Sequence, residues 1–223
     1  MNSAIIVAAG QSKRFGGNTP KQFLELLGKP VVIHTMLRFE ACPAVDEIIL
    51  VLPVSHKAEF IQIAGKYPLK KLTRIIGGGA SRAESVLNGL KAVRAETAGI
   101  VAVHDGARPL VTSDEIAETI KKAEETGAAV LTAPVTDTVK EVSGGEIVRT
   151  LDRNGLRRAL TPQCFRYDIL QKAYELAEDI TAATDESFLV EKIGFPVTFV
   201  EGSVSNIKIT QPEDLALAEF LMK

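Results

Sequence analysis

Short apolar runs rich in β-forming residues alternate along this chain with longer stretches of helical periodicity. The apolar runs occupy residues 3–8, 47–53, 73–78, 99–105 and 128–135, and the helical stretches occupy 31–40, 55–66, 81–93 and 113–127. Apolar strands followed by amphipathic helices are typical of βαβ units, in which helices cover both faces of a mostly parallel sheet. The sequence therefore predicts an α/β fold.

The predicted helices carry recognisable start signals. Capping boxes of the form Ser/Thr-x-x-Glu place helix starts at Ser81, Thr112 and Thr210. A further helix is predicted near residues 167–178, and strands are predicted at 197–202 and 206–210, ahead of the closing helix.

The alternation changes after Pro134, where two strands of alternating polarity flank the turn Ser143-Gly144-Gly145. This pattern predicts a β-hairpin, which we call the arm and place from Thr138 to about Arg153. Since a two-stranded ribbon is marginal alone in water, we expect the arm to lie against its own domain or a second subunit. Without a repeat or a linker, residues 1–223 are predicted to form a single domain with a projecting arm.

Composition narrows the class of protein. With 26 Lys and Arg against 28 Asp and Glu, the net charge is -2, so no overall basic field favours nucleic acid as a partner. Cys42 and Cys164 lie far apart and form no zinc or disulfide pattern. No apolar run reaches the length of a membrane span, and the first residues lack the basic region of a signal peptide. We therefore expect a cytoplasmic enzyme that does not act on a membrane.

The first predicted strand leads into AAGQSKRFGGNTPKQ, residues 8–22. Its glycines, Gly10 among them, allow close backbone approach, and Arg14 and Lys21 supply charge for an anion. Neither GxxxxGK[ST] nor a GxGxxG that follows a strand occurs, which argues against a P-loop NTPase and a dinucleotide dehydrogenase. Since ligands gather beyond the carboxyl ends of strands in open α/β sheets, the segment is predicted to hold a polyphosphate. The alternative is a flexible loop with solvated charges.

Two further clusters follow predicted strands. In GGGASRAES, residues 77–85, three glycines and Ser85 suit a base, ribose or phosphate, and the alternative is a capped strand-to-helix turn. In VHDGARP, residues 103–109, Asp105 is a candidate ligand for Mg²⁺ or ribose and Arg108 for a second anion. The alternative there is an Asp–Arg surface pair, and His104 is predicted to be a packed strand histidine rather than a base.

These three segments, the first extended by Phe23, and four others in the same order along the chain resemble the 2-C-methyl-D-erythritol 4-phosphate cytidylyltransferase family. The others are DTVK, DRNGLRRALTPQ, TDES and EGSVSNIKITQPEDLALAE. The resemblance covers essentially the whole chain. It implies a Rossmann-like, three-layer fold of the nucleotide-diphospho-sugar transferase type, and it implies that CTP and 2-C-methyl-D-erythritol 4-phosphate react to give the cytidylyl alcohol and pyrophosphate, with Mg²⁺.

The resemblance also implies roles for particular residues. Catalysis would depend on four cations: Arg14, Lys21, Arg153 and Lys208. CTP would bind at Ala8, Ala9, Gly10, Gly79, Ser85 and Asp105. The phosphoalcohol would bind at Asp105, Arg108, Thr138, Arg153, Thr161, Thr184 and Lys208, with Thr138 and Arg153 reaching over from the partner in a homodimer.

One position departs from the family pattern. Ala80 stands where an acidic residue is expected after the glycines, which puts a carboxylate contact to ribose in doubt. Two alternatives stay open: a cytidylyltransferase for another polyol phosphate, such as ribitol 5-phosphate, and a catalytically silent nucleotide-binding protein. The presence of Arg14, Lys21 and Lys208 argues against the second.

Overall fold

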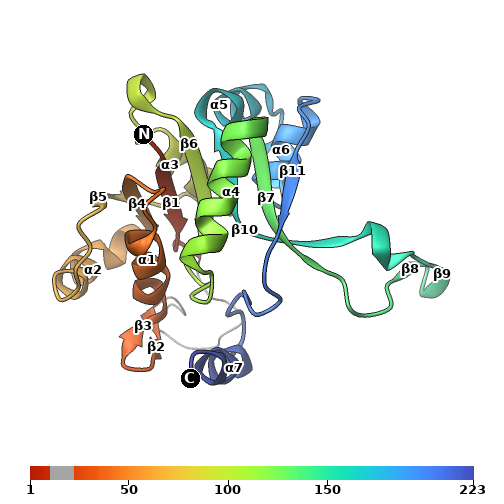
Figure 1. The fold of residues 1–223 in the computed structure, drawn as a ribbon, viewed down its shortest axis with the longest axis horizontal. Coiled ribbons are helices and arrows are strands. Elements are labelled where there is room, and N and C mark those ends of the chain that lie inside the picture. The colour runs from red at the N-terminus through yellow and green to blue at the C-terminus, as the bar shows by residue number, and fades with distance from the viewer. Residues whose placement is uncertain (11–22) are drawn as a thin grey trace.

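A seven-stranded sheet forms the centre of the computed structural model, which describes residues 1–10 and 23–223 (Figure 1). Its strands follow the order β11 (Thr198–Glu201), β7 (Ala128–Pro134), β10 (Arg157–Arg166), β6 (Ile100–Asp105), β1 (Ser3–Val7), β4 (Glu47–Leu52) and β5 (Leu72–Gly77). β10 runs antiparallel to its two neighbours, and the other pairs are parallel. The predicted α/β class with a mostly parallel sheet is confirmed.

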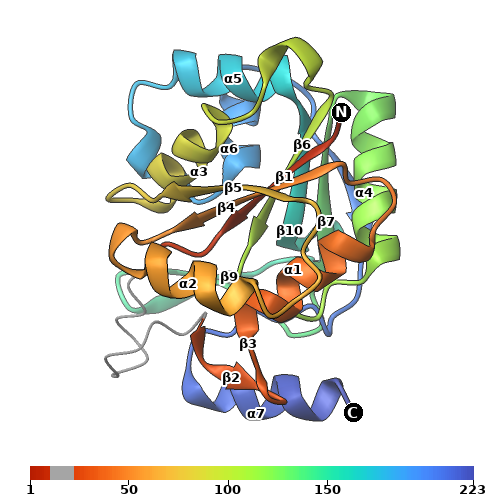
Figure 2. The ribbon, with the colours of Figure 1, turned by 90° about the vertical axis from the view of Figure 1, so that its left-hand side faces the viewer.

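Helices cover both faces of this sheet (Figure 2). One layer holds α1 (Val31–Ala41), α2 (Lys57–Ala64) and α4 (Ser113–Thr126), and the other holds α3 (Arg82–Leu90), α5 (Tyr167–Leu176) and α6 (Glu186–Lys192). Alternate residues of β1 pack against the two layers: Ala4 and Ile6 pack with the first layer, and Ile5 packs with the second. No helix within residues 1–10 and 23–223 is long and apolar enough to cross a bilayer.

Smaller elements complete the chain. β2 (Glu25–Leu26) and β3 (Lys29–Pro30) form a short ribbon, beside which α7 (Pro212–Leu221) packs. Single 3-10 turns occur as η3 (Val54–His56), η4 (Ala95–Thr97), η5 (Arg153–Gly155) and η6 (Ile180–Ala182).

The predicted helix starts at Ser81 and Thr112 are confirmed, and both capping boxes are complete. The predicted start at Thr210 is wrong by one residue: Gln211 is the N-cap, and Asp214 closes the box. The Asp214 carboxylate accepts from the backbone N–H groups of both Thr210 and Gln211, and Pro212 then fits the first helical position.

The strand predicted at residues 206–210 is wrong as well. This segment has no strand pairing and crosses the end of β6, where the Ile209 N–H donates to the Ala107 carbonyl over 2.9 Å. Its side chains are not buried alternately as in a strand: Asn206 and Ile209, three residues apart, are buried, and Lys208 between them is partly exposed.

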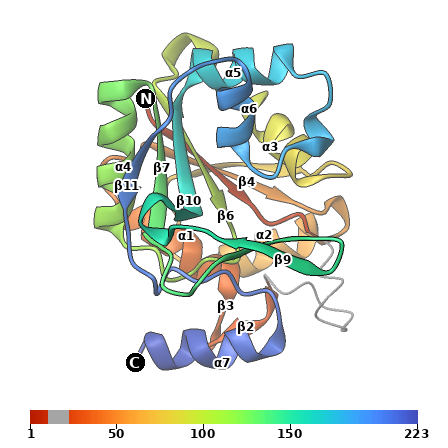
Figure 3. The same ribbon diagram turned by 90° about the vertical axis from the view of Figure 1, so that its right-hand side faces the viewer.

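The predicted arm is present as β8 (Lys140–Ser143) and β9 (Glu146–Thr150), and it extends away from the sheet (Figure 1). In Figure 3 the arm is on the side that faces the viewer and crosses in front of the body. The turn needs glycine, because Gly144 and Gly145 have φ of 59° and 87°. Every residue of both strands is exposed, including Val142 and Ile147, each 65% exposed. The single-domain prediction stays a prediction.

The carboxyl ends of the central strands share one edge of the sheet. Val7 lies opposite Asp105 on one side and Val51 on the other, and Leu52 lies opposite Gly77. From β1 the chain first builds β4 and β5 on one side and then returns to build β6 on the other. The crevice between β1 and β6 is therefore the topological switch point, where ligands of such sheets bind.

Candidate active site

Asp105, the last residue of β6, is the centre of a cluster of charged groups at the switch point. One carboxylate oxygen, Oδ1, lies 3.1 Å from Arg82 Nε, and the other, Oδ2, lies 2.9 Å from Lys208 Nζ and 3.3 Å from Arg108 Nε. The Asp105 side chain is only 9% exposed, against 35% for Lys208. The sequence alternative of an Asp–Arg surface pair is therefore wrong.

The electrostatics of Asp105 follow from this crowding. Burial works to raise its pKa, but Arg82, Lys208 and Arg108 outweigh burial and hold the pKa well below its usual range. Asp105 is therefore an anion at every physiological pH.

Arg82 and Glu186 are the members of the cluster that the sequence analysis missed. Arg82 begins α3 after the Ser81 cap, and Glu186 begins α6 after the Asp185 cap. Arg82 Nη1 lies 2.8 and 2.9 Å from the two Glu186 oxygens. Both residues lie in segments that carry the family resemblance, GGGASRAES and TDES. The signal that could have found them is a charged residue at the start of a helix that begins at the same edge of the sheet as Asp105.

A metal ion does not fit at Asp105. Both of its oxygens already accept from cationic donors, and three positive charges surround them, which opposes a divalent cation. Within the described part of the chain, no group of three or more His, Cys, Asp or Glu side chains forms a metal site. The prediction that remains is that Mg²⁺ binds through the phosphates of the nucleotide and that Asp105 is not one of its ligands.

Behind Asp105 lies a buried polar contact between β6 and β10. The Thr161 hydroxyl accepts from the Asp105 N–H over 3.2 Å and lies 3.0 Å from His104 Nδ1, while His104 Nε2 lies 3.2 Å from the Arg108 carbonyl. Since a carbonyl only accepts, the imidazole proton is on Nε2, and Thr161 donates to Nδ1. Burial lowers the pKa of His104 to about 3, so the imidazole is neutral and serves packing, as predicted.

His104 should contribute measurably to the pH dependence of the free energy of unfolding. Its folded pKa of about 3 lies below the ordinary 6.5, so the unfolded chain binds one more proton between these values. As the pH is lowered from 6 to 4, the free energy of unfolding is therefore expected to fall by about 1 kcal/mol per pH unit from this group alone. Urea titrations of wild type and His104→Gln should differ by that slope, because other groups contribute equally to both. Parallel pH profiles would contradict this assignment.

Asn206 was also missed, and it ties the same residues together. Its side-chain Nδ2 donates to the Thr161 backbone carbonyl over 3.0 Å, and the backbone carbonyl of Asn206 accepts from Arg108 Nη1 over 2.9 Å. Asn206 is fully buried, so it fixes the turn that delivers Lys208 to Asp105. The structure thus brings together four predicted residues: Asp105, Arg108, Thr161 and Lys208.

The glycine-rich turn after β5 lies against the end of β1. A Cβ on Gly78 would come within 2.3 Å of Ala9 Cβ, and one on Gly79 within 2.4 Å of Glu84 Cβ. The Ser85 hydroxyl accepts from the Gly79 N–H over 3.1 Å and donates to the Ser81 carbonyl over 2.8 Å. Small residues are therefore required here, and Ser85 shapes the turn from a buried position.

The remaining predicted site residues that the structure describes lie outside the Asp105 cluster. Ala8 is buried, while Gly10, Gly79 and Thr184 are exposed at the ends of their elements. Thr138 and Arg153 are exposed at the root of the arm, where Arg153 Nη1 donates to the Thr136 carbonyl. Within the described residues, neither contacts the Asp105 cluster. The predictions for Arg14 and Lys21 lie outside the described residues.

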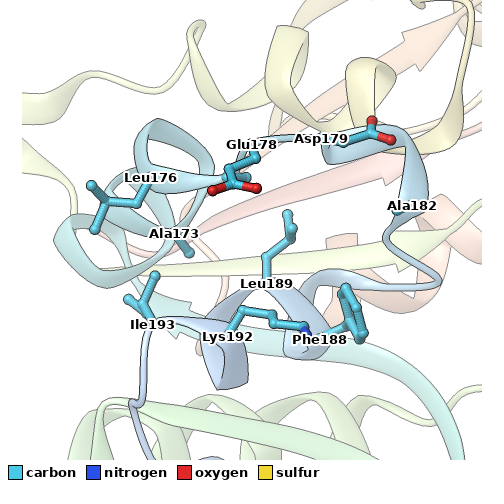
Figure 4. Close-up of a pocket in the computed structure, with 10 residues that line it drawn as sticks. Ala173, Leu176, Glu178, Asp179, Ala182, Phe188, Leu189, Lys192 and Ile193 are labelled. Carbon is cyan, nitrogen blue, oxygen red and sulfur yellow. The ribbon is translucent and has the colours of Figure 1, made fainter.

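A separate pocket of about 470 Å³ opens between α5, η6 and α6 (Figure 4). Its lining includes Leu176, Phe188, Leu189 and Lys192, and none of the predicted site residues that the structure describes. The mostly apolar lining does not suit phosphates, so the candidate site is the charged cluster.

Nucleotidyltransferases combine a doubly wound sheet with glycine-rich turns and cations at the switch point, and the fold and the site place this chain in that class. A sequence model of the family described as "IspD: 2-C-methyl-D-erythritol 4-phosphate cytidylyltransferase" matches residues 2–223. The chain belongs to this family, as the sequence analysis predicted.

Individual relatives support this assignment to the family. The chain is 46% identical to the 2-C-methyl-D-erythritol 4-phosphate cytidylyltransferase of Syntrophus aciditrophicus, over 99% of this chain and 95% of the relative. It is 43% identical to that of Bacillus velezensis, over 98% and 94%. Among solved structures, 4-diphosphocytidyl-2C-methyl-D-erythritol synthase from Anaerococcus prevotii superposes with a TM-score of 0.87 at 29% identity, over 100% of this chain and 96% of that one.

Proposed function

We propose that this chain transfers a cytidylyl group from CTP to 2-C-methyl-D-erythritol 4-phosphate, in the non-mevalonate route to isoprenoid precursors. The products are 4-diphosphocytidyl-2-C-methyl-D-erythritol and pyrophosphate. The observation that carries the proposal is the Asp105 cluster, which presents Arg108 and Lys208 beside the crevice. Two fixed cations suit a phosphomonoester. We also propose that the reaction takes place in the cytoplasm.

The chemistry needs positioning and charge rather than a base. A phosphate oxygen of the alcohol substrate attacks the α-phosphorus of CTP, and the bond from that phosphorus to the pyrophosphate oxygen breaks. Since the nucleophile is already an anion and pyrophosphate is already a stable leaving group, cations and in-line geometry suffice. We assign Lys208 and Arg108 to the substrate phosphate and Arg14 and Lys21 to the α-phosphate.

Substrate choice provides the direct test. Pyrophosphate release should be measured with CTP, UTP, ATP and GTP, each with 2-C-methyl-D-erythritol 4-phosphate and with ribitol 5-phosphate. We expect CTP with the methylerythritol substrate to give the highest kcat/KM. Because Ala9 and the glycine turn pack within van der Waals contact, a purine would have to displace backbone, at a cost on the order of 1–3 kcal/mol or about 5- to 150-fold.

Two results would contradict the proposal. Equal turnover of ATP and CTP would mean that the glycine turn does not select the base. Preference for ribitol 5-phosphate would favour the alternative polyol specificity.

We also propose that the chain is a homodimer whose arms complete each other's site. The arm is exposed along its whole length and carries Val142, Ile147 and Val148 to solvent. A ribbon of this kind gains stability only by packing against something. Thr138 and Arg153 at its root suit an anion, and in a two-fold dimer both arms bury the same surface.

A further inference from the structure

Glu186 is the most buried charged group near the switch point, and the proposed mechanism gives it no role. Its side chain is 1% exposed, and both of its oxygens accept from Nη1 of Arg82. Burying a carboxylate is costly unless it is paired and hydrogen-bonded. Packing alone therefore does not account for a carboxylate at this buried position.

Glu186 is itself held from two sides. The Tyr174 hydroxyl on α5 lies 3.3 Å from Glu186 Oε1, and the Glu186 N–H donates to the Gln163 side-chain oxygen on β10 over 3.1 Å. The Asp185 cap fixes the start of α6 as well, and Asp185 accepts from the other end of the Gln163 amide over 2.9 Å. The carboxylate thus has one fixed position, set by three elements of the body.

Arg82 links this fixed carboxylate to Asp105. With Nη1 on Glu186, the guanidinium presents Nε to Asp105 Oδ1 over 3.1 Å. The other Asp105 oxygen, Oδ2, then remains for Lys208 and Arg108, at 2.9 and 3.3 Å. Without Glu186, the five donors of Arg82 would be free to take both Asp105 oxygens and compete with Lys208.

From this arrangement we propose that Glu186 is a positioning residue for the phosphoalcohol site. It holds Arg82 on one oxygen of Asp105, so that Lys208 and Arg108 stay on the other oxygen, where they meet the substrate phosphate. This inference rests on the proposed function for the identity of the substrate.

The balance of charge agrees with this role. Among the described residues, the ion pairs of this cluster join three cations, Arg82, Arg108 and Lys208, to two carboxylates, Asp105 and Glu186, which leaves one net positive charge. Arg82 is neutralised between the two carboxylates, so the excess charge lies with Arg108 and Lys208. An incoming phosphate is thereby drawn to the side of the cluster that faces the crevice.

The kinetic test is Glu186→Gln, which keeps the shape and removes the charge. We expect the KM for 2-C-methyl-D-erythritol 4-phosphate to rise about tenfold, while the KM for CTP stays within about twofold. The double variant Glu186→Gln/Arg82→Gln should have the same KM for the phosphoalcohol as the single variant Arg82→Gln, because the two residues act as one unit. Glu191→Gln removes an exposed charge from the same helix and should change neither KM.

A second measurement does not depend on turnover. In ¹⁵N-resolved NMR, the Arg82 Nε–H signal, assigned by its loss in Arg82→Lys, should be sharp in wild type and in Glu191→Gln. It should broaden or shift in Glu186→Gln. If wild type releases no pyrophosphate, the proposed function fails, and this signal still decides whether Glu186 holds Arg82.

Several results would overturn the proposed role of Glu186. An unchanged Nε–H signal, or an unchanged KM for the phosphoalcohol in folded Glu186→Gln, would overturn the proposal. So would equal rises in the KM for both substrates. If Glu186→Gln does not fold, Tyr174→Phe replaces it, since it removes only the hydroxyl beside Glu186. It should raise the KM for the phosphoalcohol two- to threefold and leave the KM for CTP unchanged, and no change would equally overturn the proposal.

Discussion

Replacing Lys21 by alanine is expected to lower kcat about 100-fold, while the KM for CTP changes less than about threefold. Negative charge shifts toward the leaving pyrophosphate and the equatorial oxygens in the transition state, so a cation held there acts more strongly on the transition state than on bound CTP. Single-turnover quench-flow with saturating CTP measures the chemical step directly.

Lys13 provides the matched control for this experiment. It lies in the same glycine-rich segment, and the family resemblance assigns it no role in the site. Lys13→Ala should retain nearly full kcat. A folded Lys21→Ala protein with unchanged kcat would show that transition-state charge is stabilised elsewhere.

Mixing two variants that are each impaired at the phosphoalcohol site should restore activity if the arms are exchanged. Arg153→Ala breaks the site that the arm reaches, and Lys208→Ala breaks the site in its own body. In a heterodimer of the two, one site carries both changes and the other carries neither. An equal mixture gives about half heterodimers, so about a quarter of wild-type activity should return after subunit exchange.

Two controls make the complementation decisive. Each variant alone should show a raised KM for the phosphoalcohol and near-normal CTP binding. Subunit exchange should be followed by mass spectrometry of differently labelled chains. No recovery despite verified exchange, or a fully active monomer at micromolar concentration, would contradict arm exchange.

Much of the fold could be predicted because local pattern and tertiary structure agree in it. β1, β4 and β6 are continuous apolar runs since both faces of the sheet are covered. The hairpin was evident because its turn needs two glycines with positive φ.

β10 was not predicted, and its sequence shows why. Its first three residues are exposed, and Pro162 interrupts a run that would otherwise be read as a central strand. The structure accommodates the proline where the register shifts between Ala159 and Gln163. Only the tertiary pairing with β6 and β7 makes this segment a strand.

The site was only partly predictable for a related reason. Asp105 and Arg108 stand together in sequence at a strand end, so their proximity could be inferred. Arg82 and Glu186 are 104 residues apart, and single-sequence patterns do not report which helix starts meet. Lys208 entered only through family resemblance, and its pairing with Asp105 depends on a segment whose predicted strand is wrong.

The arm leaves and rejoins the sheet at a single point. β7 and β10 are neighbouring antiparallel strands, and Pro134 lies directly opposite Arg157. A short turn across that pair would close the sheet with no other connection altered. The arm, which we propose to mediate self-association, is therefore a modular part of the chain: its length and sequence can change without disturbing the nucleotide-binding body. If the proposed dimer is correct, a body without the arm would keep its fold and leave the phosphoalcohol site of its neighbour incomplete.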